Sequence, residues 1–219
     1  MIALLSTVIA LAGPVAAGPH IDNPYWPMAP GSRWVYRETD DQGSRQKVVV
    51  KVTNRTKRVA SGIVARVVRD TVTEDGQLVE DTFDWYAQDR RGNIWYLGED
   101  TTEYEDGKPV STQGSFEDGV NGARRGIVML ARPRAGRRYR EERAPGAAED
   151  RARVLSRHEQ VQVPFGHFTN VLMTSNTNPL EPRVQEYKWY ARGVGPVLAT
   201  SVSGSSDREV LLRYERGRF

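Results

Sequence analysis

The sequence of 219 residues contains no cysteine. Disulfide bonds, cysteine-ligated zinc or iron–sulfur sites and thiol nucleophiles are therefore excluded. With no cysteine to acylate, we also expect no lipid anchor. A chain of this length buries roughly 70% of the surface that its unfolded form exposes, so its core needs no covalent cross-links and a single domain is expected.

Histidine is scarce, since His20, His158 and His167 are the only three. The spacing of the last two is not one that zinc sites use. So few histidines give little support for Ser-His-Asp chemistry, and neither a G-x-S-x-G elbow nor a P-loop occurs. The segment Gly193-Val194-Gly195 lacks the third glycine of a dinucleotide-binding loop. We therefore expect no cofactor and favour a protein that is not an enzyme.

Long apolar runs are absent apart from the uncharged residues 2–17. The run is too short to span a bilayer, which takes about 20 apolar residues. It has the length of a signal-peptide core, and the small residues Val15-Ala16-Ala17 follow it as a cleavage site. The basic residue that usually follows Met1 is missing. The pattern predicts a signal peptide over 1–17, a mature chain that begins at Gly18, and export to the periplasm, cell envelope or medium without a membrane span.

Helical periodicity is almost absent, and short alternating segments dominate instead. Val48, Val50 and Val52 alternate with polar residues, as a half-buried strand requires. Turn residues such as Asp75-Gly76 separate these segments. The expected strands are 33–39, 47–54, 63–72, 78–88, 94–105, 152–163, 168–174, 184–191, 197–202 and 208–214, with a further short one at 137–142.

Strands at this spacing predict an all-β fold, a single curved antiparallel meander that closes into a barrel or half-barrel. Residues 18–31 contain three prolines after His20 and are expected to form a Pro-rich linker. The β-domain is then 32–219. Residues 116–152 are rich in Arg, Gly and Pro, which indicates an irregular insert.

Two pairs of segments carry a resemblance to known proteins. The first pair is WYAQD at 85–89 with GNIWYLGED at 92–100, and the second is VPFGHF at 163–168 with YARGVG at 190–195. Both resemble segments of a group of exported bacterial β-rich proteins of unknown function. The resemblance implies an exported, antiparallel, barrel-like domain, and it brings no activity and no functional residues.

Charge is distributed unevenly along the chain. Residues 70–118 hold 14 acidic and 3 basic residues, a net charge of −11, whereas residues 122–157 hold 11 basic and 4 acidic residues, a net charge of +7. The acids can form a solvated face, pair with the arginines, or form a cation site or acid–base pair. Weak candidates for metal ligands are Asp84, Glu99, Glu103 and Glu105. The arginines lack interleaved aromatic residues, and we expect no nucleic-acid partner.

Aromatic residues recur on the expected strands and are mostly expected in the core. A barrel lined in this way can also hold an apolar ligand. The candidate ligand-binding residues are Trp34, Trp85, Trp95, Trp189 and Tyr187. The sequence therefore favours an exported, non-enzymatic protein that binds an apolar small molecule or an envelope component. A carboxylate-dependent, glycosidase-like hydrolase and a purely structural interaction module are the alternatives.

Overall fold

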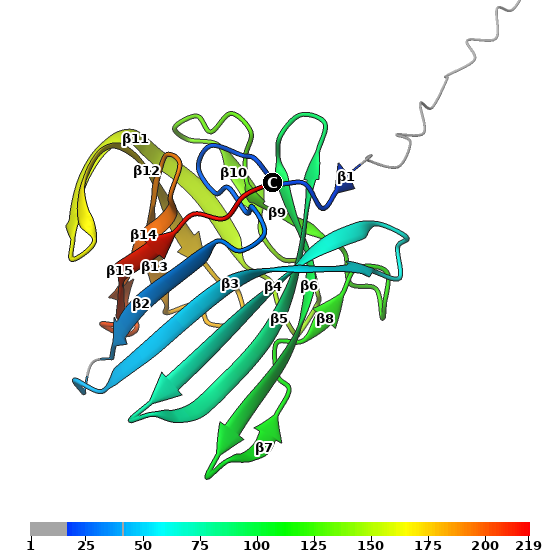
Figure 1. Ribbon diagram of the computed structural model, residues 1–219, viewed down its shortest axis with the longest axis horizontal. Helices are drawn as coiled ribbons and strands as arrows, with labels where there is room; N and C mark the ends of the chain where they lie inside the picture. The colour runs from blue at the N-terminus through cyan, green and yellow to red at the C-terminus, as the bar shows by residue number, and fades with distance from the viewer. Residues whose placement is uncertain (1–16, 41) are drawn as a thin grey trace, which may run out of the picture.

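The computed structural model describes residues 17–40 and 42–219, and this part of the chain contains strands and no helix (Figure 1). The predicted signal peptide lies outside the described residues, except for Ala17. No stretch within the described ranges forms a helix long and apolar enough to cross a membrane.

Within the described residues, fifteen strands form one antiparallel sheet. The first half of the chain contains β1 (Ala17–Gly18), β2 (Arg33–Thr39), β3 (Arg45–Arg58), β4 (Val64–Glu74), β5 (Gln77–Asp89), β6 (Ile94–Glu105) and β7 (Lys108–Ser111). The second half contains β8 (Phe116–Glu117), β9 (Gly126–Met129), β10 (Arg138–Arg140), β11 (Arg151–Val163), β12 (Gly166–Thr177), β13 (Gln185–Ala191), β14 (Gly195–Ser203) and β15 (Arg208–Glu215).

The sheet follows chain order from β10 to β15, continues through β2, and ends at β7. The pairing of β15 with β2 joins the two ends of the chain and curls the sheet into a half-barrel (Figure 1). No strand pairing closes the ring among the described residues. The all-β, curved antiparallel meander that the sequence predicts is thus confirmed.

Tight turns set the register of the long hairpins. Asp75 and Gly76 have φ angles of 48° and 82°, and Asp106 and Gly107 have φ angles of 50° and 72°. Two successive positive φ angles are typical of the type I′ turns that join twisted antiparallel strands. The Asp-Gly pairs therefore form the hairpins that the sequence predicts.

The segment expected as a Pro-rich linker, 18–31, packs into the core instead of spanning solvent. Ile21, Tyr25 and Met28 are buried, with at most 5% of each residue exposed. The side-chain amide of Asn23 donates to the carbonyl oxygens of Gly92 and Leu130 at 2.8 and 3.3 Å. The segment therefore caps one end of the half-barrel.

The expected insert, 116–152, supplies β8, β9 and β10 along the open seam. β8 and β9 pair with β6, and β10 pairs with β11. The amide of Arg124 donates to the carbonyl of Arg143 at 3.0 Å across the seam. A Cβ on Gly126 would lie 2.1 Å from the carbonyl oxygen of Glu141, so this close approach requires glycine.

The sheet has two separate apolar clusters. The larger one lies mainly inside the half-barrel and includes Ile21, Met28 and Trp34. The smaller one lies on the other face of β4, β5 and β6 and centres on Trp85 and Leu97. β5 is therefore covered on both faces, with Phe83, Trp85 and Ala87 in the outer cluster and Asp84 and Tyr86 facing the half-barrel.

Candidate functional site

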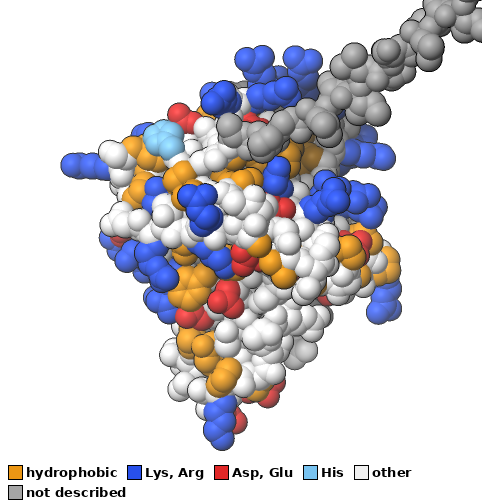
Figure 2. Space-filling view, turned by 90° about the vertical axis from the view of Figure 1, so that its right-hand side faces the viewer, with side chains coloured by type: hydrophobic (Ala, Val, Ile, Leu, Met, Phe, Trp, Pro, Cys, Tyr) orange, Lys and Arg blue, Asp and Glu red, His pale blue; other side chains and the backbone are white. Residues whose placement is uncertain are grey.

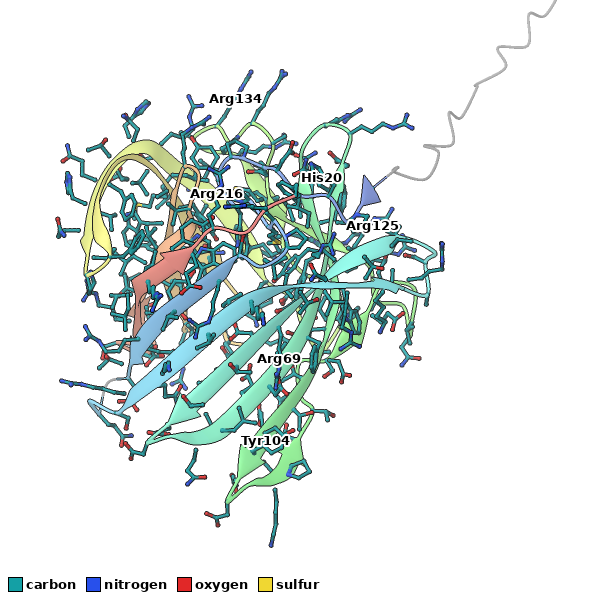
Figure 3. All side chains as sticks on the ribbon, viewed as in Figure 1. His20, Arg69, Tyr104, Arg125, Arg134 and Arg216 are labelled. Carbon is teal, nitrogen blue, oxygen red and sulfur yellow. The ribbon has the colours of Figure 1, made fainter. Side chains whose placement is uncertain are left out.

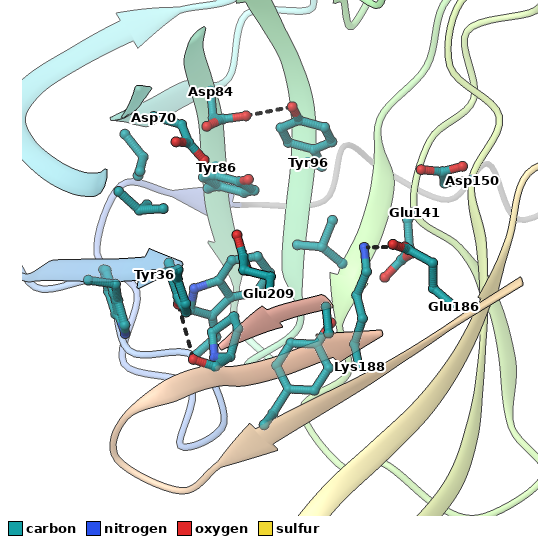
Figure 4. Close-up of a pocket in the computed structure, with 18 of the residues that line it drawn as sticks. Tyr36, Asp70, Asp84, Tyr86, Tyr96, Glu141, Asp150, Glu186, Lys188 and Glu209 are labelled. Atoms are coloured by element: carbon teal, nitrogen blue, oxygen red, sulfur yellow. Dashed lines mark hydrogen bonds and ion pairs between the residues drawn. The ribbon is translucent and has the colours of Figure 1, made fainter. Parts of the chain in front are cut away.

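A cavity of about 350 Å³ lies within the half-barrel (Figure 4). Its walls come from β2 to β6, β9, β13, β14 and β15, from Glu141, Glu142 and Asp150 between β10 and β11, and from Trp26 and Met28 of the capping segment. This volume lies within the range of protein sites that bind small molecules. The curl of the sheet is what brings these strands, distant in sequence, around one space.

The cavity lining is strongly acidic. Among the described residues, it contains eight carboxylic acid side chains and one basic side chain, Lys188. The sequence predicted an apolar interior, and the structure places these carboxyl groups beside the aromatic rings there. Five of these acids face inward because every second residue of β2, β4, β5, β13 and β15 does so, and the other three, Glu141, Glu142 and Asp150, come from the segment between β10 and β11.

Three of the acids, Glu38, Asp70 and Glu209, form what we call the acid triad. Glu38 and Glu209 are direct partners in neighbouring strands β2 and β15. Like charges in this arrangement are destabilising. Oδ1 of Asp70, on β4, is buried and makes no hydrogen bond in the described part of the protein. The triad therefore contains a buried carboxyl oxygen, Oδ1 of Asp70, that the described part of the protein leaves without a donor.

Burial and repulsion from neighbouring acids raise the pKa values of all three acids of the triad. Burial raises the pKa of Asp70 to about 8, and Glu209 and Glu38 raise it further by repulsion. Burial also raises the pKa of Glu209 to about 8, with repulsion from Glu38 as the next cause. The pKa of Glu38 is raised, again mainly by burial. Near neutral pH, Asp70 and Glu209 therefore retain protons, and a positive charge placed beside them would favour their ionised forms.

A second acidic group surrounds Lys188, whose Nζ lies 3.4 Å from Oε2 of Glu186. Burial alone would lower the pKa of Lys188, but Glu186, Glu141 and Asp150 outweigh it and raise the pKa. Glu141 also accepts a hydrogen bond from Nδ2 of Asn176 at 2.5 Å. Glu186 and Glu141 therefore have partners within the protein, unlike Oδ1 of Asp70.

Asp84 and Glu99 form a third arrangement around the hydroxyl of Tyr96. The hydroxyl lies 2.6 Å from Oδ1 of Asp84 and 2.8 Å from Oε2 of Glu99. Burial raises the pKa of Asp84 to about 7 and that of Glu99 to about 7. The hydroxyl has only one hydrogen and can donate it to only one of the two carboxyl groups. If the other carboxyl group is protonated, it can donate a hydrogen bond to the hydroxyl oxygen, so both contacts are satisfied.

A β-bulge in β6 produces this geometry. Asp84 is opposite Glu99 whereas Tyr86 is opposite Tyr96, so β6 has one residue more than β5 over this interval. Gly98 in the bulge has a φ angle of 126°, and a Cβ there would lie 2.0 Å from the carbonyl oxygen of Phe116. The extra residue brings Glu99 to the same face as Tyr96, which simple alternation would not do.

Aromatic rings form the remaining wall of the cavity. Trp26 lies 5.7 Å from Tyr86 and 6.0 Å from Tyr190, measured between ring centroids. Nε1 of Trp34 donates to the carbonyl of Val194 at 2.8 Å, and the hydroxyl of Tyr36 donates to the carbonyl of Pro196 at 3.0 Å. Both polar hydrogens are therefore already used in hydrogen bonds to the backbone. A ligand in the cavity can contact the faces of the rings, and the hydroxyl oxygen of Tyr36 can accept a hydrogen bond from it.

The structure separates the aromatic residues that the sequence grouped as ligand-binding candidates. Trp34 lines the cavity. Trp85 and Trp95 belong to the outer cluster, and Nζ of Lys57 lies 3.2 Å from the centroid of the Trp85 ring. Tyr187 and Trp189 alternate along β13 with the lining residues Glu186, Lys188 and Tyr190, so they lie on the opposite face.

The structure also does not bring the four candidate metal ligands together. Asp84 lines the cavity and Glu99 contacts Tyr96, while Glu103 and Glu105 lie further along β6, where Glu105 is exposed. In the described ranges, no group of three or more acidic or histidine side chains is arranged to hold a metal ion. The sequence reasoning missed Glu38, Asp70 and Glu209, and the one signal for Glu38 was its alternation with the aromatic residues Trp34 and Tyr36 on β2.

The two oppositely charged segments meet at one ion pair in the described part of the chain, Arg125 with Asp118 at 2.9 Å. The other arginines of residues 122–157 form no ion pair with the acids of residues 70–118 in the described part of the chain. Arg90, Arg91, Arg132, Arg134 and Arg137 line a surface hollow at the capped end. Basic side chains gather at this end in Figure 2, and Arg134 points away from the molecule in Figure 3. The protein thus has a basic outer end and an acidic interior.

Fold and site together define a half-barrel β-protein with an acidic, aromatic internal cavity. No family model matches the chain, and no curated protein matches its sequence. The fold is similar to the crystal structure of a protein described as a "putative lipoprotein" from Parabacteroides distasonis. The identity is 14%, the TM-score is 0.49, and the match covers 88% of this chain and 99% of that one.

Proposed function

We propose that this chain is an exported, non-enzymatic protein that binds a small molecule inside its half-barrel. The observation that carries the proposal is the cavity of about 350 Å³, where aromatic faces lie beside eight carboxyl groups and Oδ1 of one of them, Asp70, is buried without a hydrogen-bond partner among the described residues. A filled structural core would not leave buried carboxyl oxygens without donors, because each such group costs about 1–3 kcal/mol. Conformational stability alone therefore does not explain the lining.

Native mass spectrometry of the protein purified from its own host tests the proposal. A bound small molecule is expected, and it should be lost in an Ala199→Phe variant, because Ala199 lines the cavity. Thr200→Phe is the matched control, since Thr200 is the next residue of β14 and does not line the cavity. Wild-type protein that carries no ligand, and binds none from a concentrated host extract, would contradict the proposal.

Export is supported by the uncharged run 2–17 and by the resemblance to exported bacterial β-proteins. N-terminal sequencing of protein from its own host is expected to begin near Gly18. An intact Met1 on protein in the cytoplasmic fraction would contradict this part of the proposal.

A second candidate function is hydrolysis by paired carboxyl groups, as in glycosidases. Asp84 and Glu99 favour it because both have raised pKa values and face each other across Tyr96. However, only Asp84 of the two lines the cavity. Tyr96 also occupies the space between them that a glycosidic oxygen would need. Turnover of chromogenic glycosides that is abolished by Asp84→Asn would favour this candidate over simple binding.

A further inference from the structure

The acid triad lacks a cation of its own. Lys188 is the one basic side chain that lines the cavity in the described ranges, and it pairs with Glu186. Oδ1 of Asp70 is buried without a hydrogen bond, and the side chains of Glu38 and Glu209 lie opposite each other. A ligand that brings hydrogen-bond donors and a positive charge would satisfy all three groups.

Aromatic side chains lie beside the triad on the same inner face. Trp34, Tyr36 and Glu38 are alternate residues of β2, and all three line the cavity. Tyr190 and Trp26 complete the aromatic wall. An ammonium group is attracted to the face of an aromatic ring, most strongly where water is excluded. The apolar part of a ligand would gain from burial against the same rings.

We propose that the cavity binds a small organic amine, whose protonated nitrogen contacts Asp70 and is attracted by the charges of Glu209 and Glu38, and whose carbon skeleton packs against Trp34 and Tyr190. This inference rests on the proposed binding function and names the chemical class of its ligand. A bare metal ion fits less well, because the described acids do not converge on a coordination sphere.

Titratable side chains from the neighbouring elements face the triad. They are Tyr36 on β2, Glu80 and Asp84 on β5, Glu186 and Lys188 on β13, and Asp207 before β15. Lys188 is the only cation among them and the acids outnumber it. An anionic ligand would therefore meet repulsion, and a neutral ligand would leave the triad without compensation.

Matched pairs of probes test the charge of the ligand directly. We would titrate ligand-free protein at pH 8 with benzylamine, tryptamine and hexane-1,6-diamine, and with benzyl alcohol, tryptophol and hexane-1,6-diol as neutral counterparts. Calorimetry or thermal shift gives the affinities. At least one amine is expected to bind tenfold or more tightly than its alcohol. Equal binding of amine and alcohol in every pair, or binding by none of the amines, would overturn the inference.

Variants then locate the amine. Asp70→Asn is expected to weaken amine binding tenfold or more while leaving alcohol binding unchanged. Glu209→Gln is a second test at the triad if Asp70→Asn fails to fold. Asp100→Asn is the matched control, because Asp100 is exposed on β6. Unchanged amine affinity in both triad variants would place the amine elsewhere and overturn the inference.

Failure of the inference and failure of the binding function give different results. If the host protein carries a neutral or anionic molecule that is lost in Ala199→Phe, the binding function stands and the amine inference fails. If the host protein carries no ligand and no probe binds, both fail.

Discussion

The hydroxyl oxygen of Tyr96 lies 2.6 Å from Oδ1 of Asp84, inside the half-barrel. The same hydroxyl lies 2.8 Å from Oε2 of Glu99, so one tyrosine connects two buried carboxyl groups. Neighbouring carboxyl groups that share a proton titrate as a pair. The arrangement holds β5 and β6 together at the bulge and keeps Asp84 at the cavity wall.

Tyr96→Phe is expected to lower the free energy of unfolding by roughly 1.5–3 kcal/mol, because both carboxyl groups lose a hydrogen-bond partner in a buried place. Urea denaturation at pH 7 measures the change. Tyr104→Phe is the control, since Tyr104 lies near the tip of β6 and makes no side-chain hydrogen bond within the described chain (Figure 3). Equal stability of the two variants would contradict a structural role for the Tyr96 hydroxyl.

Conformational stability is expected to fall as the pH rises through the titration range of the acid triad. In unfolded chains the pKa of Asp is about 4, whereas in the folded protein the pKa of Asp70 is raised to about 8, mainly by burial. Between these values the folded state binds more protons than the unfolded state, so stability decreases with rising pH. Thermal unfolding of ligand-free protein from pH 5 to pH 9 measures this.

Asp70→Asn should weaken that pH dependence and raise the melting temperature at pH 8. The variant removes a buried carboxyl group that must ionise without a partner. The same substitution is expected to weaken amine binding, so stability and binding should change in opposite directions. A lower melting temperature for Asp70→Asn at pH 8 would contradict the charge assignment of the triad.

Binding of an amine is expected to release protons at pH 7–8. The incoming cation favours the ionised forms of Asp70 and Glu209, whose pKa values are both raised to about 8 by burial in the free protein. About one proton per amine should leave the site. Calorimetry in buffers of different ionisation enthalpy counts the protons, and uptake of protons on binding would contradict the model of a protonated triad.

The pKa of Asp89 is lowered, whereas the pKa values of the triad acids are raised. Its carboxylate accepts hydrogen bonds from the amides of Arg91 and Asn93, from Nδ2 of Asn93 and from Nε1 of Trp95, all at 2.9 Å. Burial alone would raise the pKa of Asp89, but these hydrogen bonds outweigh it and lower the pKa. The stability that Asp89 contributes is therefore present above pH 4 and lost as the pH falls through its lowered pKa.

Asp89→Asn is expected to reduce the free energy of unfolding at pH 7 by roughly 2 kcal/mol, because an amide replaces an acceptor-only carboxylate in a site made of donors. Chemical denaturation at pH 7 and pH 3 measures the loss, which should shrink at the lower pH. A loss that is the same at both values would rule out the ionised carboxylate as its cause.

Trp85→Ala is expected to cost about 3–5 kcal/mol of stability, since Trp85 is buried in the outer cluster under the ammonium group of Lys57. It should leave ligand affinity unchanged, because Trp85 does not line the cavity. Trp34→Phe provides the comparison, as a smaller change inside the cavity that should alter affinity more than stability. Loss of ligand binding in Trp85→Ala, with the fold intact, would contradict the separation of the two clusters.

Period-two alternation and turn chemistry were sufficient to predict the strands from the sequence. The observed bounds of β2 and β6 are those predicted, Arg33–Thr39 and Ile94–Glu105. The Asp-Gly turns adopt the positive φ angles that their composition favours. These features depend on neighbouring residues alone, which is why one sequence is enough to reveal them.

The face of each strand that points inward could not be predicted in the same way. On β5 the sequence indicates that Phe83 and Trp85 share one face, and aromatic residues usually point to the core. The structure covers the outer face of β5 with Lys57 and with part of the insert, so Trp85 is buried there and Asp84 faces the cavity. Burial on both sides of a sheet removes the polar face from which inward and outward are normally distinguished.

The sequence by itself determined the strands, their turns, the absence of cysteine chemistry and the uneven distribution of charge. Only the tertiary structure decided that Glu38, Asp70 and Glu209 line one cavity, because the pairing of β15 with β2 and the curl of the sheet bring β2, β4 and β15 around the same space. Local patterns fix the conformation of each segment, but the distances between charges depend on pairings between residues far apart in sequence. The acidic character of the cavity is therefore a property of the assembled half-barrel.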